Sequence, residues 1–235
     1  MQHVASLSFL PLILKARIAS AILKLTHFQY KNTSVRKIIT FLFGCLLLIH
    51  LPLSAALLDH YHLLNYLDNY GNLDLTDKPY TQLPEGLTVK RDLNISRTDI
   101  KSLPRGLDVQ GSLVATNCAL ENVPRGTKIK GSANFLGARI KNWPAGIRVG
   151  GYLNFTDTSL NKLPARLRVK GDLSVVRTPL KELPDGLIVD GDLHIGGSGI
   201  RAFPDKLTVK GNIFLGGNVI KKWPEKLTLG GVVVR

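Results

Sequence analysis

Apolar residues recur with a period of 20 through most of this chain. Eight prolines, from Pro84 to Pro224, are spaced by 20 residues, and an apolar residue precedes each of them. After each proline, apolar and polar positions alternate, as from Leu87 to Ile95. Strict alternation predicts short β-strands with one buried face, and a fixed period of this length predicts a stack of similar coils.

A glycine lies in the middle of each alternating segment. It occupies positions 111, 131, 151, 171, 191, 211 and 231, and Arg91 takes its place in the first repeat. Glycine inside a strand pattern indicates a bend or a close approach of two backbones. We therefore expect each strand to turn a corner there, within a consensus that reads LPxGLxVxGxLxLxxTxI.

Each repeat directs about six apolar side chains to one side, and no single repeat can bury them. Stacking the coils at the strand spacing of roughly 4.8 Å buries these side chains and pairs each strand in parallel with the next, so that eight coils would span about 38 Å. The predicted fold is therefore a repeat solenoid, mainly β, with parallel strands.

The two ends of the array differ from its middle. Residues 71–75 fall in register with the GxLxL segment and predict a degenerate first coil. Residues 231–235 stop in mid-repeat with an apolar strand edge. Because an open apolar edge pairs readily with another chain, it predicts an end partner, self-association through this edge, or truncation of a longer array.

A family resemblance rests on the repeat itself. The segment from Leu93 to Pro104 reads LNISRTDIKSLP, and its pattern recurs across about 150 of the 235 residues. This pattern resembles bacterial leucine-rich-repeat proteins with 20-residue units, in which LxLxxNxL is followed by a Leu-Pro pair. The asparagine column of that family is occupied here by Thr98, Cys118, Ala138, Thr158, Thr178, Ser198 and Asn218. The additional LxVxG half-strand differs from the family's spacing, so a horseshoe and a straighter β-solenoid both remain open.

The resemblance implies a role in binding. Some proteins with such repeats are effectors secreted into host cells, and some of these carry a ubiquitin-ligase domain with a nucleophilic cysteine. We expect no such domain here, because the sequence ends within the repeats. Cys118 is therefore expected to be a small buried or turn residue without a catalytic role.

An apolar segment precedes the array. Residues 38–58 follow the basic pair Arg36 and Lys37 and are long enough to span a bilayer as a hydrophobic helix. The same segment fits a signal peptide, with a breaker at Pro52 and small residues that would permit cleavage after Ala56. A signal peptide, an uncleaved transmembrane anchor and a buried helix of a soluble domain remain as alternatives.

The sequence thus divides into a basic leader (1–37), a signal peptide or transmembrane helix (38–58), a capping segment with the degenerate repeat (59–82) and the repeat array (83–235). Terminal coils of a solenoid need a cover. We expect a short helix between residues 56 and 70 to supply it, through the apolar residues Leu57, Leu58, Tyr61, Leu64 and Leu67.

Charge is distributed unevenly along the chain. The formal net charge is +14, and residues 1–58 contribute six basic and no acidic residues. Because positive charge before an apolar segment stays in the cytoplasm, the repeats are expected on the other side of the membrane, in the periplasm, at the cell surface or secreted. The 44% hydrophobic content argues against disorder, and two cysteines exclude a disulfide framework within the repeats.

Basic residues are concentrated in the middle of the array. No acidic residue lies between Glu121 and Asp157, and Lys170 is expected to be partly neutralised by Asp172, two residues further along the strand. The candidate ligand-binding residues are Arg125, Lys128, Lys130, Arg139, Lys141, Arg148, Arg166, Arg168 and Lys170. Stacked like charges repel, which favours an anionic partner, although ordinary solubilising surface charge is the alternative.

Nucleic acid is not the expected partner, because the repeats are predicted to be exported and the aromatic residues occupy core columns. Those aromatic residues are Phe135, Trp143, Phe155, Phe203 and Trp223. The expected partner is an acidic protein surface or another anionic surface ligand. The membrane is an additional partner if residues 38–58 remain uncleaved.

No pattern in the sequence points to an enzyme, a metal site or a cofactor. His194 stands alone at an outward position, and the acidic pair Asp190 and Asp192 resembles calcium-binding repeats but occurs once. We therefore predict a non-enzymatic binding or scaffold protein, exported or membrane-anchored. The alternatives are a self-assembling structural protein and a secreted effector that acts on a host protein.

Overall fold

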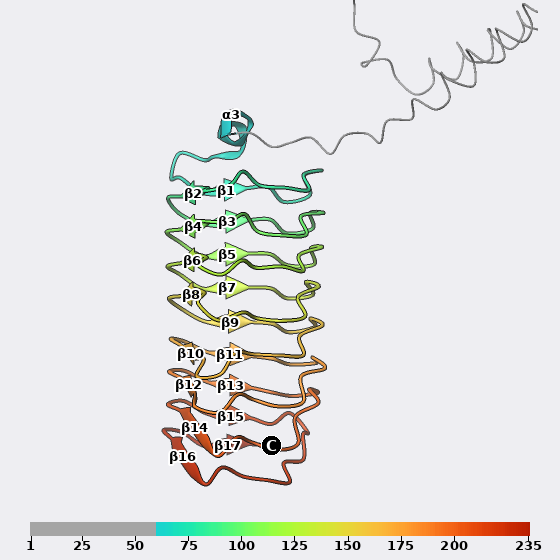
Figure 1. Ribbon diagram of the computed structural model, residues 1–235, viewed down its shortest axis with the longest axis vertical. Helices are drawn as coiled ribbons and strands as arrows, with labels where there is room; N and C mark the ends of the chain where they lie inside the picture. Colours follow the sequence, from blue (N-terminus) through green and yellow to red (C-terminus); the bar gives the residue numbers. More distant parts are fainter. Residues whose placement is uncertain (1–59) are drawn as a thin grey trace, which may run out of the picture. The chain divides into compact units, whose positions relative to one another are not determined.

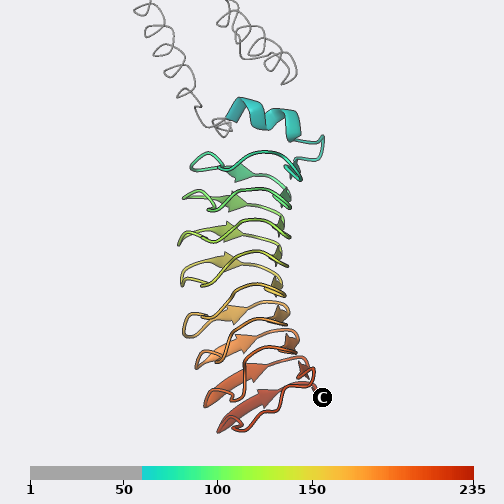
Figure 2. The same cartoon turned by 90° about the vertical axis from the view of Figure 1, so that its right-hand side faces the viewer.

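The computed structural model describes residues 60–235. These residues form short strands that are wound into a stack of coils (Figure 1). The predicted leader and the predicted signal peptide or transmembrane helix lie outside the described residues. Within residues 60–235, no helix has the length and apolar character needed to cross a membrane. Figures 1 and 2 show the coils lying one above another. Parallel strands of successive coils pair residues 20 positions apart, as Leu93 and Leu113 do, which confirms the predicted parallel-strand solenoid.

One side of the stack is a continuous nine-stranded parallel sheet. Its strands, in order, are β1 (Leu73–Asp74), β3 (Leu93–Asn94), β5 (Leu113–Val114), β7 (Ala133–Asn134), β9 (Leu153–Asn154), β11 (Leu173–Ser174), β13 (Leu193–His194), β15 (Ile213–Phe214) and β17 (Val233–Val234). Each residue pairs with the residue 20 positions further along, as Leu93 does with Leu113. The degenerate coil at residues 71–75 is therefore a true coil, because β1 pairs with β3 in the same register.

A second side of the stack carries two separate four-stranded parallel sheets. The first contains β2 (Thr88–Val89), β4 (Asp108–Val109), β6 (Lys128–Ile129) and β8 (Arg148–Val149). The second contains β10 (Arg168–Val169), β12 (Leu187–Val189), β14 (Lys206–Val209) and β16 (Lys226–Leu229). Strands on two sides of each coil correspond to the β-solenoid alternative, since the extra half-strand forms its own ladder.

The core lies between these two sides. Inward positions of both strands are buried, as at Val89, Leu93 and Ile95, and so are the residues that precede the prolines in most coils. The six inward columns read from the sequence are thus the core of the solenoid. Trp223 is an exception to the expectation that the aromatic residues are packing residues: it lies edge-on against Phe203 at 5.3 Å, but 44% of it is exposed, because no further described coil lies against its other side.

The mid-strand glycines lie at the corner between the two sheets, as the sequence predicted. Gly191 donates its N–H to the carbonyl of Gly171, and Gly211 donates to Gly191 in turn. A Cβ atom on Gly191 would lie 2.8 Å from the carbonyl carbon of Gly171. The backbones of successive coils therefore approach too closely at this corner for a side chain.

In several coils, a buried polar residue lies in the turn that follows the strand of the nine-stranded sheet, and its side chain forms a hydrogen bond within that turn. The Thr98 hydroxyl donates to the Ile95 carbonyl at 2.7 Å, and the equivalent threonines make the same bond. Cys118 takes this position in its coil, with Sγ 3.1 Å from the Ala115 carbonyl, and burial raises the pKa of its thiol. It is the small buried residue that was expected.

A short helical segment precedes the first coil, but different residues face the stack than predicted. It consists of α3 (His60–Leu63) and the 3-10 turn η2 (Leu64–Tyr66). Leu63 is buried, and the Tyr66 ring packs edge-on against Tyr80 at 5.7 Å. Tyr61, Leu64 and Leu67 are exposed, and Leu63 and Tyr66 face the coil instead. Leu57 and Leu58 lie outside the described residues.

Candidate anion-binding face

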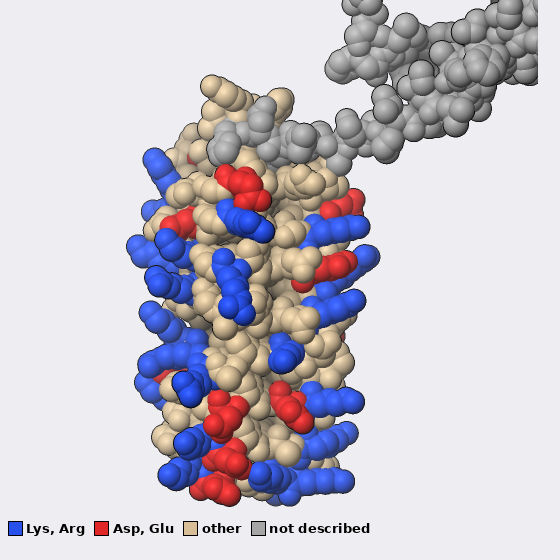
Figure 3. Space-filling model, viewed as in Figure 1, with Lys and Arg blue, Asp and Glu red and all other residues tan. Residues whose placement is uncertain are grey.

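The structure brings five of the nine candidate basic residues onto one surface. Lys128, Lys130, Arg148, Arg168 and Lys170 belong to β6, β8 and β10 or follow them directly, on three consecutive coils, and all five are exposed. We call these five residues the basic face. Figure 3 shows basic side chains in blue along the edge of the stack that carries β2 to β16 in Figure 1.

The other four candidates lie on different sides of the coils. Arg125 and Arg166 are in the turns that precede β6 and β10. Arg139 and Lys141 lie in the segment that leads from β7 to the isolated bridge at Asn142. A coil changes direction several times within 20 residues, so charges that are neighbours in the sequence point in different directions.

The basic face surrounds a shallow open hollow of about 490 Å3. Its floor contains the apolar side chains of Ile129, Ile147 and Val149 and the backbone of Gly150. Asp108 is its sole acidic lining residue. The hollow thus combines an apolar floor with a rim of five cations.

Two of the five cations have carboxylate partners. Lys128 Nζ lies 3.7 Å from Asp108, and Arg168 makes a bidentate contact with Asp190 at 2.9 and 3.1 Å. Within the described residues, Lys130, Arg148 and Lys170 make no ion pair and no side-chain hydrogen bond, and we call them the unpaired cations. The middle of the basic face is therefore free to hold an anionic group.

The expected neutralisation of Lys170 by Asp172 does not occur. Asp172 accepts the backbone N–H of Asp192 at 2.8 Å, and Asp92 accepts that of Ser112 in the same way. At the corner, the backbone N–H groups of Asp192 and Ser112 have no carbonyl acceptor in the ladder of the described residues. The carboxylates of Asp172 and Asp92 in the preceding coil accept these hydrogen bonds instead. Lys170 is therefore exposed and forms no ion pair with Asp172.

The backbone ladder of this side is interrupted beneath the basic face. β8 and β10 follow each other in the stack but do not pair, which is why the side is divided into two sheets (Figure 1). Elsewhere each coil donates to the preceding one, as Arg148 N does to Thr127 O at 3.0 Å and Ile188 N to Leu167 O at 2.9 Å. We call the interruption between β8 and β10 the break.

Three hydrogen bonds are missing at the break. Among residues 60–235, the backbone N–H groups of Arg168, Lys170 and Gly171 have no backbone acceptor, and the carbonyls of Ile147 and Val149 have no backbone donor. The inward side chains at the break are also less covered than elsewhere: Ile147, Val149 and Leu167 are partly exposed, whereas the equivalent residues of the neighbouring coils are buried. Residues with unpaired backbone groups at the break therefore also line the hollow.

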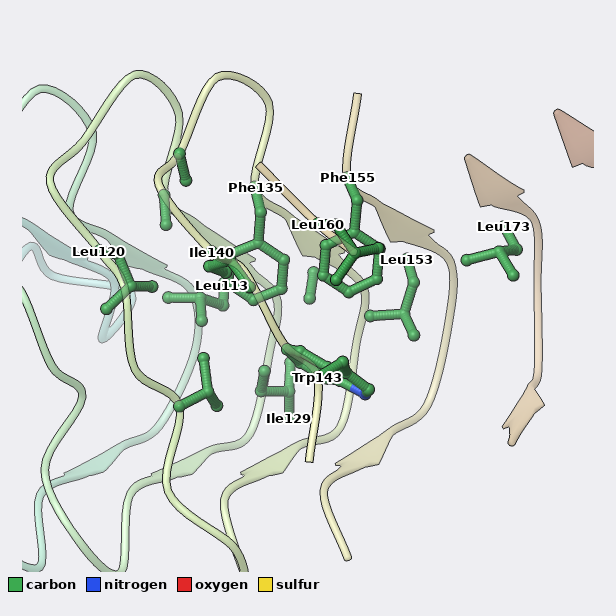
Figure 4. Close-up of a cluster of buried hydrophobic side chains, with 14 of the residues drawn as sticks. Leu113, Leu120, Ile129, Phe135, Ile140, Trp143, Leu153, Phe155, Leu160 and Leu173 are labelled. Carbon is green, nitrogen blue, oxygen red and sulfur yellow. The ribbon is translucent and has the colours of Figure 1, made fainter. Parts of the chain in front are cut away.

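Three aromatic rings fill the core at the level of the break. Trp143 packs against both Phe135 and Phe155, with ring centroids 5.4 and 5.1 Å away, and the two phenylalanines stack on each other at 5.5 Å (Figure 4). Smaller residues hold these core positions in the neighbouring coils, as Ala115 and Val175 do. β9 and β11 stay paired on the adjacent side of the same coils, so the loss of pairing is confined to the side that carries β8 and β10.

Amide hydrogen exchange is expected to reveal the break directly. The amides of Arg168, Lys170 and Gly171 should exchange at least roughly tenfold faster than those of Arg148 and Ile188, because only the latter are hydrogen-bonded in the ladder. Exchange followed by NMR spectroscopy gives the rates for each residue. Equal protection of all five amides would show that β8 and β10 pair in solution.

Asp190 is expected to titrate below the usual range of aspartates. Hydrogen bonds from Lys210 and then Arg168 lower the pKa of Asp190 by stabilising the carboxylate. A lowered folded pKa stabilises the fold above the unfolded value of roughly 3.9, and this contribution is lost as the pH falls through the folded value. In an NMR titration, Lys210→Gln should raise the pKa of Asp190, and an unchanged value would contradict this assignment.

Other polar residues singled out in the sequence have structural contacts. His194 stacks on Phe214 with ring centroids 4.5 Å apart. Asp192 accepts the backbone N–H of Asn212 at 2.6 Å, and Asp190 is bound to cations as described above. Among residues 60–235, no group of three potential metal ligands is present.

Sequence reasoning did not find the break or the role of Asp190. Two signals were present: the large aromatic residues in consecutive core positions, and Gly150 in a column that carries Lys130 and Lys170 in the adjacent coils. Neither signal indicates a loss of strand pairing by itself, since bulky residues are common in cores.

Comparison with known proteins gives no relative. The chain matches no protein-family model, and it shows no significant similarity to a curated protein or to a solved structure. The parallel-strand solenoid therefore rests on the geometry of the coils. Membership of the leucine-rich-repeat proteins stays a hypothesis.

Proposed function

We propose that this protein is a non-enzymatic binding or scaffold protein whose basic face recognises an acidic protein surface or another anionic surface ligand. The observation that carries the proposal is the group of unpaired cations, Lys130, Arg148 and Lys170, on three consecutive coils around an apolar hollow. Like charges on neighbouring strands repel one another, and an anionic ligand would relieve that repulsion. Arg97 and Arg177, by contrast, are paired across coils with Asp77 and Asp157.

The proposal includes an exported or membrane-anchored location, with the repeats on the non-cytoplasmic side. It is supported by the apolar segment 38–58 and the basic residues in front of it. It also includes descent from bacterial leucine-rich-repeat proteins, supported by the LxLxxTxIxxLP pattern.

A charge-matched pair of variants tests the binding proposal in the full chain. The first variant is Lys130→Gln/Arg148→Gln/Lys170→Gln, and the probes are immobilised poly-glutamate and heparin. If each exposed charge contributes about 0.5–1 kcal/mol, the three together weaken binding by roughly 10- to 100-fold. Biolayer interferometry at low and high salt measures the affinities, and binding should weaken with added salt.

The control is Lys101→Gln/Lys181→Gln/Lys221→Gln, which removes the same charge from exposed lysines on another side of the coils. It should leave the affinity within about twofold, because charges outside the site act only through the screened long-range field. An equal loss of affinity in both triple variants would show that the probes bind by non-specific charge attraction and not at the basic face. Absence of binding to both probes would refute it.

Self-assembly is a second candidate, favoured by exposed apolar residues at the far end of the stack. Trp223, Leu227, Val232 and Val234 are exposed there, beside the unpaired outer edges of β16 and β17. Strand edges of this kind pair readily with another copy. Light scattering measures the molar mass of the protein in solution. A monomer mass that persists at high protein concentration would exclude self-assembly.

A further inference from the structure

The break presents a row of hydrogen-bond donors opposite a row of acceptors. Arg168, Lys170 and Gly171 offer N–H groups on one side, and Ile147 and Val149 offer carbonyls on the other. These are the atoms that every other neighbouring pair of coils on this side uses for its ladder. These two rows can bind a ligand that carries the complementary donors and acceptors, as a neighbouring strand does elsewhere in the ladder.

An extended peptide satisfies both rows, whereas a simple anion does not. A phosphate, sulfate or carboxylate accepts hydrogen bonds from Arg168 and Lys170 but leaves a negative charge beside the carbonyls of Ile147 and Val149. A peptide strand carries donors on one edge and acceptors on the other. Addition of a strand to an unpaired sheet edge is a common mode of peptide recognition.

The side chains around the break specify the peptide's composition. A strand that continues the parallel ladder points alternate residues outward, between Arg148 and Arg168, and the others inward, beside Ile147, Val149 and Leu167. Gly150 lacks a side chain, so the space between Lys130 and Lys170 is open to an outward side chain of the ligand. Acidic residues fit the outward positions, and small apolar residues fit the inward ones.

We propose that the break between β8 and β10 is a binding site for an extended peptide in which acidic and apolar residues alternate, held as an added strand. This inference rests on the proposed function and names its ligand class. A strand between β8 and β10 needs them about two strand spacings apart, roughly 9.6 Å. No hydrogen bond joins β8 to β10 within the described residues, so opening this side breaks none, and the paired strands β9 and β11 hold the coils together on the adjacent side, around the corner.

The test uses the full chain and a fluorescein-labelled peptide in which glutamate and valine alternate, measured by fluorescence anisotropy. In the matched probe, the backbone amides of the glutamates are N-methylated, which keeps the charge and removes the donors to Ile147 and Val149. The methylated peptide should bind at least about tenfold more weakly. The unmodified peptide should also slow amide exchange at Arg168 and Lys170, whereas a heparin oligosaccharide should not.

The outcomes separate this inference from the proposed function. Equal binding of both peptides, or heparin binding that depends on the unpaired cations without any peptide binding, would overturn strand addition and leave the proposed function intact. Peptide binding that is lost in Lys130→Gln/Arg148→Gln/Lys170→Gln and weakened by methylation supports both. If the triple substitution changes the affinity for none of the anionic probes, both the proposed function and strand addition fail.

Discussion

Replacing Phe155 by alanine is expected to lower the free energy of unfolding by about 3–5 kcal/mol. Phe155 is fully buried and contacts both Phe135 and Trp143, so its removal leaves a cavity in the aromatic cluster. Each coil contacts only its neighbours, so a cavity at mid-stack weakens the coupling between the two halves. Urea unfolding followed by circular dichroism measures the loss.

Tyr152→Ala is the control, because Tyr152 lies in the same coil but is 42% exposed. Its effect should stay within about 0.5 kcal/mol. A similar loss in both variants would mean that the aromatic cluster does not carry the packing of this coil. The milder variant Phe155→Leu tests the origin of the break: if ring volume separates β8 from β10, the amides of Arg168 and Lys170 should become more protected.

Gly191→Ala is expected to destabilise the solenoid by about 2–3 kcal/mol. The added Cβ would lie 2.8 Å from the carbonyl carbon of Gly171 and 2.9 Å from the backbone nitrogen of Asp172, and it would also meet Asp172 Oδ1. Relief requires that two coils move apart at the corner where their backbones are hydrogen-bonded. Thermal and urea unfolding measure the effect.

Gly126→Ala separates steric collision from loss of a glycine conformation. Gly126 has φ +85°, but a Cβ there meets nothing within 4 Å. Its cost should be about 1 kcal/mol, the strain of a left-handed alanine. If Gly191→Ala lowers the free energy of unfolding no more than Gly126→Ala does, the close approach of the coils at the corner is contradicted.

The position of the candidate site could be predicted only in part. The sequence indicated a basic region and included all five residues of the basic face, because exposed columns can be read from the alternation. It did not separate Lys130, Arg148 and Lys170 from Arg139 and Lys141, which face another side of the coils. It also could not show which cations have partners, since Arg168 meets Asp190 from the next coil.

The sequence by itself determined the solenoid, its 20-residue period, its parallel register and its core columns. It could do so because each coil buries the same apolar columns against its neighbours, so that one repeat defines the next. The tertiary structure alone decided where that regularity fails. β8 and β10 do not pair beside the cluster of Phe135, Trp143 and Phe155, although every apolar column continues through these coils, and loss of strand pairing is a property of packing that no single column records.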